Sequence, residues 1–292
     1  MHDLGTPAHG LFEAQSTIAA LRARRGGGIV TSLLACALET NAVTDALVVS
    51  SDTQRPWARP KIARTREEVL ASAGSKYVLV PYGTLPNSLT HDSAIVGLPC
   101  QLELNQSCPG LKIGLFCGLA ISRRGILYLL RKLSIQPSEI KSLDYRAEGG
   151  GLQVELRDGR KIRYPSYFWL SYFFSYHRCL RCRDFSARFA DVAVGDRRPE
   201  WSTVIVRTKR GNDLFEDAVR QGYVRARTIG YQEFLEKVQS PFFVKELGEG
   251  YQATPLVRVR GRWMESLPLW ILKKAGRLIY RHSLAHRKHQ VE

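Results

Sequence analysis

The residues of this 292-residue chain best suited to chemistry are its cysteines, two of which form a Cys-x-x-Cys pair at Cys179 and Cys182. That spacing lets two thiolates face one centre from a single turn of chain, as in zinc sites, iron–sulfur clusters and redox dithiols. Cys100 and Cys117 each follow an apolar run that predicts a strand. Together the four thiolates would complete a site for zinc or for a four-iron cluster.

The other features near the pair favour a metal centre over a dithiol. A thioredoxin-type dithiol is expected directly after a strand, whereas Asp184 and Phe185 follow the pair here and further cysteines are available. Cys36 lies within an apolar run, which is typical of a small buried thiol. Cys108 is an alternative ligand, although an ordinary loop thiol explains it as well.

A glycine run precedes an apolar helix near the N-terminus. Gly27 and Gly28 stand before this predicted helix, which ends at Glu39, and Thr31 falls in its first turn. A glycine loop that leads into a helix exposes backbone N–H groups at the positive end of the helix dipole, which suits a phosphate. A flexible joint would also explain the glycines.

The elements that must position these residues alternate between strands and helices. Strands are predicted at residues 46–50, 94–97, 112–117, 191–196 and 203–206. Their alternation with helices predicts an α/β fold with a mixed, partly parallel sheet flanked by helices. Residues 152–164 alternate in polarity around a turn and predict a β-hairpin subdomain. Ligands bind at the carboxyl ends of parallel strands, where Cys100 and Cys117 are expected.

The charge of the chain limits its partners. A net charge of +16 and a pI near 9.8 favour anionic partners. Nucleic acid is not favoured among them, because no nucleic-acid-binding motif is found in the sequence. No apolar run is long enough to span a bilayer and the first residues do not resemble a secretory signal, so a cytoplasmic location is expected.

The C-terminal tail predicts a basic amphipathic helix over residues 267–282. The apolar residues on one arc are Leu267, Ile271, Leu272, Leu278 and Ile279, and the basic residues on the other are Lys273, Lys274, Arg277 and Arg281. This pattern suits a helix lying on an anionic membrane surface, peripheral to the inner face of the membrane. It suits equally a terminal helix packed on the domain.

Several motifs, taken in order, resemble one family. They are Gly97-Leu98-Pro99-Cys100-Gln101, Gly114-Leu115-Phe116-Cys117, Cys179-x-x-Cys182-x-Asp184-Phe185, and Val194-Gly195-Asp196 with Trp201-Ser202-Thr203. Upstream, Gly27-Gly28-Ile29-Val30-Thr31 and Gly74-Ser75-Lys76-Tyr77 belong to the same series. The chain is similar in these stretches to the coenzyme F420 hydrogenase/dehydrogenase beta-subunit family.

The resemblance implies an FAD module with a [4Fe–4S] cluster beside the flavin, exchanging electrons with the deazaflavin coenzyme F420 or another redox substrate. The implied cluster ligands are Cys100, Cys117, Cys179 and Cys182. The implied FAD environment is Gly27, Gly28, Thr31, Ser75, Lys76, Gly195 and Asp196. A lysine or a helix N-terminus near a flavin stabilises the anionic reduced ring or a phosphate.

The resemblance also implies a division of the chain and a partner. Residues 1–120 and 121–250 would form the two parts of the flavin-binding module, and residues 251–292 the basic tail. Many relatives carry a ferredoxin-like domain that this sequence lacks, so a ferredoxin-like protein or another subunit would supply electrons in trans. The alternative functions are a zinc-stabilised binding protein and a cofactor-free scaffold that keeps the fold.

Overall fold

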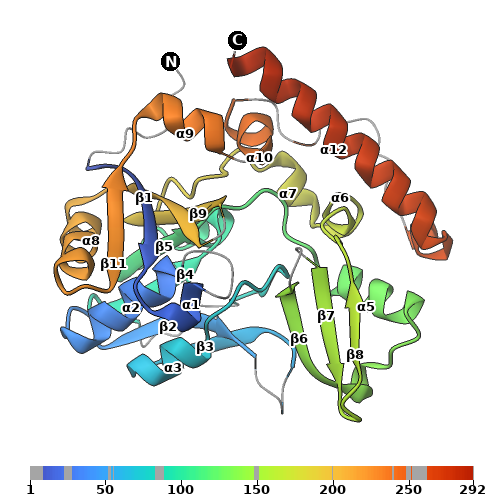
Figure 1. Ribbon diagram of the computed structural model, residues 1–292, viewed down its shortest axis with the longest axis horizontal. Helices are drawn as coiled ribbons and strands as arrows, with labels where there is room; N and C mark the ends of the chain where they lie inside the picture. The colour runs from blue at the N-terminus through green and yellow to red at the C-terminus, as the bar shows by residue number, and fades with distance from the viewer. Residues whose placement is uncertain are drawn as a thin grey trace.

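A large mixed sheet is the main structural element of the protein (Figure 1). The computed structural model describes residues 9–22, 28–51, 54, 56–82, 89–147, 151–198, 200–238, 240–247, 251 and 262–291. The sheet has eight strands in the order β11-β1-β10-β9-β5-β4-β2-β3. The strands are β1 (Gly10–Ser16), β2 (Asp45–Ser50), β3 (Arg59–Ala63), β4 (Ser93–Gly97), β5 (Leu111–Leu115), β9 (Val192–Arg198), β10 (Trp201–Val206) and β11 (Val224–Thr228).

The centre of the sheet is parallel and its edges are antiparallel. β2, β4, β5 and β9 run in one direction, and β1 shares it because both β1 and β9 are antiparallel to β10. β3 and β11 form antiparallel edges. The prediction of a mixed, partly parallel sheet is therefore confirmed.

Helices cover both faces of this sheet, because neighbouring strand residues point to opposite sides. On β2, Ala46 and Val48 join a core with α2 (Ile29–Glu39), α3 (Arg66–Ala71) and α8 (Lys209–Arg220). Leu47 faces a second core on the other side. That core is closed by α4 (Pro99–Leu104), α9 (Tyr231–Lys237), α10 (Ser240–Phe242) and the segment 184–190.

A smaller antiparallel sheet contains the predicted hairpin. Its strands are β6 (Ile140–Ala147), β7 (Gly151–Leu156) and β8 (Lys161–Tyr164), in that order. It shares a third core with α5 (Arg123–Lys132), α6 (Leu170–Phe174) and α12 (Leu269–Val291). The other short helices are α1 (Ala19–Arg22), α7 (His177–Arg181), the 3-10 turns Pro137–Glu139 and Arg262–Ser266, and the π-helical turn Phe243–Leu247.

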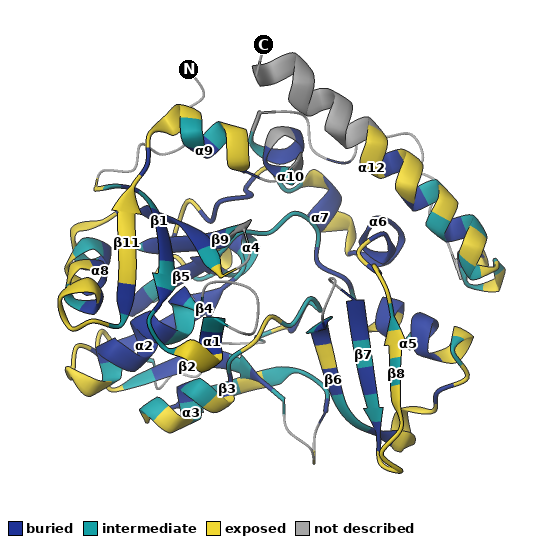
Figure 2. Ribbon diagram, in the orientation of Figure 1, coloured by how far each residue is buried: buried dark blue, intermediate teal, exposed yellow. Residues whose placement is uncertain are grey.

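The C-terminal helix α12 lies along one side of the molecule and packs through a narrow stripe (Figure 2). Leu272 and Ile279 are buried, and a Cβ on Gly276 would lie 2.6 Å from Trp169 Cβ. Leu278, predicted on the same apolar arc, is half exposed. Among the described residues, no helix combines the length and apolar character needed to cross a membrane.

Candidate metal centre and cofactor site

Two of the predicted ligand cysteines lie at the carboxyl edge of the parallel sheet. Cys100 is in the first turn of α4, which follows β4, and Cys117 is two residues past the end of β5. β4 and β5 are paired at their ends, where Gly97 lies opposite Gly114. The two cysteines therefore follow neighbouring parallel strands at the edge where they were expected.

The Cys-x-x-Cys pair reaches the same edge through α7 and the segment after it. Cys179 lies in α7 and Cys182 caps its C-terminal end. The following chain folds back across β5, where the Cys117 N–H donates a hydrogen bond to the Phe185 carbonyl oxygen over 2.9 Å. Gly114 permits this approach, because a Cβ there would collide with the side chain of Ala187.

All four predicted ligand cysteines line one small cavity, here named the thiol pocket. Its described walls are Leu79, Leu98, Pro99, Cys100, Cys117, Gly118, Ala120, Arg178, Cys179, Cys182 and Lys245. The cavity volume is about 10 Å³, enough for roughly one water molecule. Cys108 does not line it, and Cys36 is buried in the core beneath α2.

A buried lysine completes the thiol pocket and was not identified from the sequence. Lys245 is 1% exposed, and its Nζ donates a hydrogen bond to the Cys117 carbonyl oxygen over 2.7 Å. Burial alone would lower the pKa of this amine. The nearby Cys117 and Cys182 raise it by a larger amount, so the pKa lies above its ordinary value. Lys245 therefore keeps a positive charge against the sulfurs. The only local signal was one lysine inside an apolar stretch.

Burial and mutual repulsion make the pocket thiols hard to ionise. Burial raises the pKa of Cys117 to about 12, with Lys245 acting in the opposite direction and the other three thiols adding to the rise. The pKa values of Cys100 and Cys179 are also raised, chiefly by burial. Backbone hydrogen bonds from Tyr176 and Ala120 partly offset the rise at Cys179. Four thiolates together would thus need positive charge beside them, which Lys245 or a metal centre supplies.

The neighbour of this lysine, Glu246, fastens the chain after the Cys-x-x-Cys pair. Its Oε1 accepts hydrogen bonds from Phe185 N (2.8 Å), Ser186 N (2.9 Å) and Ser186 Oγ (2.9 Å). Its Oε2 accepts one from Arg188 Nη2 (3.0 Å). This carboxylate, with a side chain 4% exposed, was also missed from the sequence. The π-helical turn Phe243–Leu247 therefore contacts two segments at once. Lys245 binds the chain just after β5, and Glu246 binds the chain after the Cys-x-x-Cys pair.

The donor chemistry of the thiol pocket fits an iron–sulfur cluster. Four sulfurs and a buried cation are suited to iron, and backbone hydrogen bonds to sulfur are typical of cluster sites. In the described part of the chain, no three metal-binding side chains close on a single point as the ligands of one ion do. The cavity of about 10 Å³ is smaller than such a cluster, so the four sulfurs would have to move apart to hold it.

The candidate FAD residues fall into two groups, of which the first is the N-terminus of α2. Gly27 lies outside the described residues. Gly28 caps the helix with φ +66°, close against Leu21, and no side chain caps the first turn, which contains Thr31. A hydrogen-bonded contact of 2.7 Å between Ser16 and Ser32 holds this turn at the carboxyl end of β1.

The second group lies where the two sheets meet. Asp196, on β9, accepts hydrogen bonds from Arg146 Nη1 (2.7 Å) and from the Tyr77 hydroxyl (3.2 Å). Ser75 shares a hydrogen bond with the same tyrosine. The structure therefore brings Ser75 and Asp196 together around Tyr77, the last residue of the Gly74–Tyr77 stretch, and Arg146, which the sequence did not indicate.

The remaining two FAD candidates already have structural roles. Lys76 Nζ donates hydrogen bonds to the Ser72 and Ala73 carbonyl oxygens at the end of α3, over 2.5 and 3.2 Å. Gly195 is covered by the ring of Phe116, which occupies the space that a Cβ would need.

Family models match most of the chain. Residues 11–85 match the model for the N-terminal part of the coenzyme F420 hydrogenase/dehydrogenase beta subunit, and residues 91–231 match the model for its C-terminal part. The fold and these matches define an oxidoreductase-type α/β subunit. The chain belongs to the coenzyme F420 hydrogenase/dehydrogenase beta-subunit family. The turn that carries Lys245 and Glu246 lies beyond the matched ranges.

Individual relatives agree with the family. An uncharacterized protein of Methanocaldococcus jannaschii, MJ1349, is 30% identical over 224 residues, which is 68% of this chain and 61% of that protein. The coenzyme F420 hydrogenase subunit beta of Methanosarcina barkeri is 26% identical over 239 residues, 72% of this chain and 78% of that one. This chain therefore spans less than two thirds of the length of the first relative.

A solved structure shows the same fold. A chain of the F420-reducing [NiFe] hydrogenase complex from Methanosarcina barkeri superposes with a TM-score of 0.62 at 20% identity. The superposition covers 96% of this chain and 90% of that one. At this identity the likeness speaks for the fold alone.

Proposed function

We propose that the chain is an iron–sulfur flavoprotein subunit that passes electrons between a [4Fe–4S] cluster, FAD and the deazaflavin coenzyme F420 or another redox substrate. One observation carries the proposal: four cysteines from three distant segments line a single pocket with a buried lysine. Relatives named as F420 hydrogenase beta subunits support the choice of substrate.

In this proposal the thiol pocket holds the cluster, which supplies one-electron storage when bound. Cys100, Cys117, Cys179 and Cys182 would be its ligands. Lys245 offsets part of the negative charge of the four thiolates, and Arg178 adds a second, half-exposed cation at the wall. Glu246 keeps the segment after Cys182 in place, so that the pocket does not open when charge is added.

FAD would lie at the carboxyl edge of the sheet. When bound, it supplies hydride transfer and can pass on the two electrons of a hydride one at a time. The uncapped first turn of α2, with Gly28 and Thr31, offers backbone N–H groups to a phosphate. Gly27 belongs to this part of the proposal. At the junction of the sheets, Ser75 and Asp196 offer hydrogen-bonding groups to the ring or ribityl chain.

The last two FAD candidates have smaller roles in the proposal. Gly195 would contribute backbone only, because Phe116 covers its α-carbon. Lys76 would reach the cofactor only by releasing the end of α3.

The proposed module needs a partner that exchanges electrons with it. We expect a ferredoxin-like protein or another subunit in trans, and the net charge of +16 favours an acidic one. Residues 1–120 and 121–250 would act as one module, since β9 and β10 complete the sheet begun by β1 to β5. Residues 251–292 would form its basic tail.

The outer face of α12 is proposed to contact an anionic membrane surface on the cytoplasmic side. Trp270 is 66% exposed, and Lys274, Arg277 and Arg281 are exposed beside it. Truncation is a poor test, because Leu272 and Ile279 are part of the core. The double variant Trp270→Ala/Lys274→Gln should bind vesicles of anionic lipid more weakly, with neutral vesicles as control. If the native chain binds neither kind, the membrane proposal is wrong.

Cofactor content tests the proposed function directly. The full chain purified without oxygen should be yellow-brown, with about four irons per chain and one FAD. A colourless preparation with stoichiometric zinc would instead support a zinc-stabilised binding protein. A preparation with neither metal nor flavin would support a cofactor-free scaffold.

A further inference from the structure

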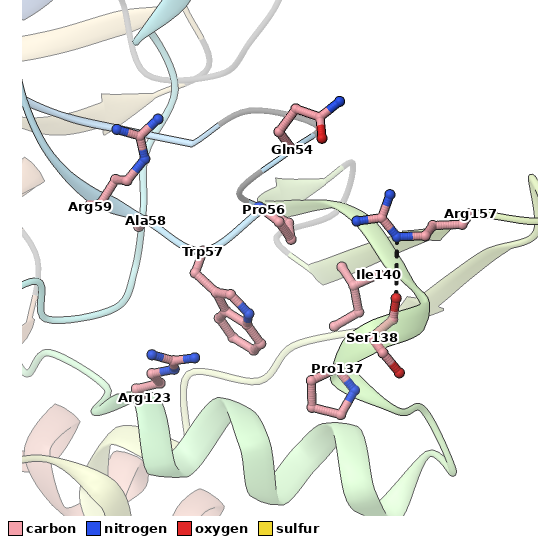
Figure 3. Close-up of a pocket in the computed structure, with 10 residues that line it drawn as sticks. All are labelled: Gln54, Pro56, Trp57, Ala58, Arg59, Arg123, Pro137, Ser138, Ile140 and Arg157. Atoms are coloured by element: carbon pink, nitrogen blue, oxygen red, sulfur yellow. Dashed lines mark hydrogen bonds between the residues drawn. The ribbon is translucent and has the colours of Figure 1, made fainter.

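A broad cleft, distinct from the thiol pocket, opens between the segment before β3 and the start of α5 (Figure 3). Its volume is about 430 Å³. We name it the Trp57 cleft. Its described walls are Gln54, Pro56, Trp57, Ala58, Arg59, Arg123, Pro137, Ser138, Ile140 and Arg157.

Flat apolar surfaces form the centre of the Trp57 cleft. The Arg123 guanidinium lies over the Trp57 ring, 4.7 Å from its centroid. Figure 3 shows the indole pointing into the space, with Arg123 on one side and Ile140 and Pro137 on the other. An indole opposite an apolar wall favours a planar ring as ligand, because both faces of such a ring gain contact.

The charge of the Trp57 cleft selects an anionic ligand. Three of its ten described wall residues are arginines and none is acidic. Arg157 is held at the rim by a hydrogen bond from Nε to the Ser138 carbonyl oxygen over 3.2 Å. Guanidinium groups bind phosphate and carboxylate in paired geometry, so a ring with such groups attached suits this wall better than a neutral ring.

The Trp57 cleft lies close to the thiol pocket. Ala120 lines the pocket and Arg123 lines the cleft, so their Cα atoms are at most about 11 Å apart along the chain. The chain between them is fixed by a hydrogen bond from the Leu79 N–H to the Ile121 carbonyl oxygen over 2.8 Å. A redox-active ring in the cleft would therefore lie near the pocket.

We propose that the Trp57 cleft binds a flavin-like ring bearing phosphate or carboxylate groups, with Trp57 against the ring and Arg123 and Arg157 on the acidic groups. The inference rests on the proposed function for its two candidate ligands of this chemistry, FAD and coenzyme F420. The exposed rim residues Gln54 and Arg157 leave an open path for exchange. The cleft is thus assigned to the substrate, coenzyme F420, rather than to the resident FAD.

Calorimetric titration of the oxygen-free, full-length protein with coenzyme F420 tests the assignment. Trp57→Ala and Arg123→Gln should each raise the Kd about tenfold or more, and Arg157→Gln by a smaller factor. 5-Deazariboflavin, which has the ring without the acidic groups, should bind weakly and respond only to Trp57→Ala. Arg160→Gln is the matched control, because Arg160 lies in the same hairpin as Arg157 but outside the cleft.

The outcomes separate this assignment from the proposed function. Unchanged F420 affinity in both Trp57→Ala and Arg123→Gln, or no F420 binding at all, overturns the assignment while iron and FAD contents stand. Loss of FAD with F420 affinity intact also overturns it, because the cleft would then be the cofactor site. F420 binding that depends on these residues in a protein without iron or FAD upholds the cleft and contradicts the proposed function.

Discussion

The thiol pocket and the Trp57 cleft are neighbouring sites that differ in volume and in the exposure of their cations. The pocket has a volume of about 10 Å³ and its cation, Lys245, is 1% exposed. The cleft has a volume of about 430 Å³ and its stacked cation, Arg123, is exposed. A closed site with a fixed counter-charge suits a resident group, whereas an open site with exposed cations suits a ligand that enters and leaves.

The two sites also differ in how they are fastened. Lys245 and Glu246 tie the pocket together with buried, charge-assisted hydrogen bonds, which are the stronger kind. In the cleft, Arg123 stacks on Trp57, and its helix α5 is joined to Glu265 by ion pairs at the surface. Substitutions in the pocket should therefore alter cofactor content, potential and stability, whereas substitutions around the cleft should alter affinity and little else.

Loss of a pocket thiol should have the largest effect. Cys179→Ser replaces a soft sulfur ligand by a hydroxyl that binds iron poorly, so iron should fall from about four per chain to below about one. Some FAD should remain. Cys108→Ser, outside the pocket, should keep its iron. Colorimetric iron analysis with a flavin spectrum checks both variants, and full iron content in Cys179→Ser would remove that residue from the ligand set.

Removal of the buried cation should come next. Lys245→Met keeps the bulk but removes a positive charge beside the thiols, so the reduced cluster should become harder to form and the midpoint potential should fall by on the order of 100 mV. A redox titration followed by electron paramagnetic resonance measures it. Lys112→Met is a matched control, because Lys112 Nζ donates to the Cys108 carbonyl oxygen over 2.7 Å, away from the pocket. Equal potentials in the two variants would contradict a role for Lys245.

Glu246→Gln should weaken the hydrogen bonds that hold the chain after the Cys-x-x-Cys pair, without changing the charge next to the thiols as Lys245→Met does. The amide keeps one acceptor for Phe185 and Ser186 but turns a donor toward Arg188 or loses that partner. The free energy of unfolding should fall by about 2 kcal/mol. Denaturant titration under reducing conditions measures the loss. Glu103→Gln, at an exposed site, should change it little; a similar loss there would show that burial is not the cause.

The fold was predictable where the signal was local. The apolar runs of β2, β4 and β5 and the polarity pattern of β7 and β8 predicted those strands directly. The edge strands β3 and β11 were missed, because Pro60 and the exposed charged residues of β11 depend on neighbouring strands for their conformation. β1 was missed for a related reason. Its Glu13 is buried and pairs with Arg227, which lies at the far end of the domain sequence.

The site was predictable by residue type and not by position. Cysteine pairs suggest metal ligands from spacing alone, and the structure gathers those four thiols around one cavity. Lys245 and Glu246 carried no comparable signal, because their partners Cys117 and Phe185 lie far away in the sequence. No sequence motif indicated the Trp57 cleft, since its three arginines come from β3, α5 and the hairpin. Chemistry that needs several segments at once is visible only after folding.

The smallest expected effect lies on α5, whose first residue, Arg123, lines the cleft. On this helix Arg124 and, over 2.6 Å, Arg131 pair with Glu265. Hydrogen bonding to Arg131, followed by Arg124, holds the pKa of this carboxyl below its ordinary value of 4.5. A lowered pKa in the folded state means that the pair stabilises the fold above the unfolded-state pKa. The contribution is lost as pH falls through the folded-state pKa.

Because the pair lies near the surface, Glu265→Gln should cost less than about 1 kcal/mol at pH 7. The difference from the native chain should shrink when the same denaturant titration is repeated at about pH 4 and below. Salt should reduce it as well, which is not expected for the buried Glu246. If Glu265→Gln lowers the free energy of unfolding as much as Glu246→Gln does, or independently of pH, then α5 beside the cleft is held as firmly as the thiol pocket. The distinction between a closed site for a resident group and an open one for an exchanging ligand would then fail.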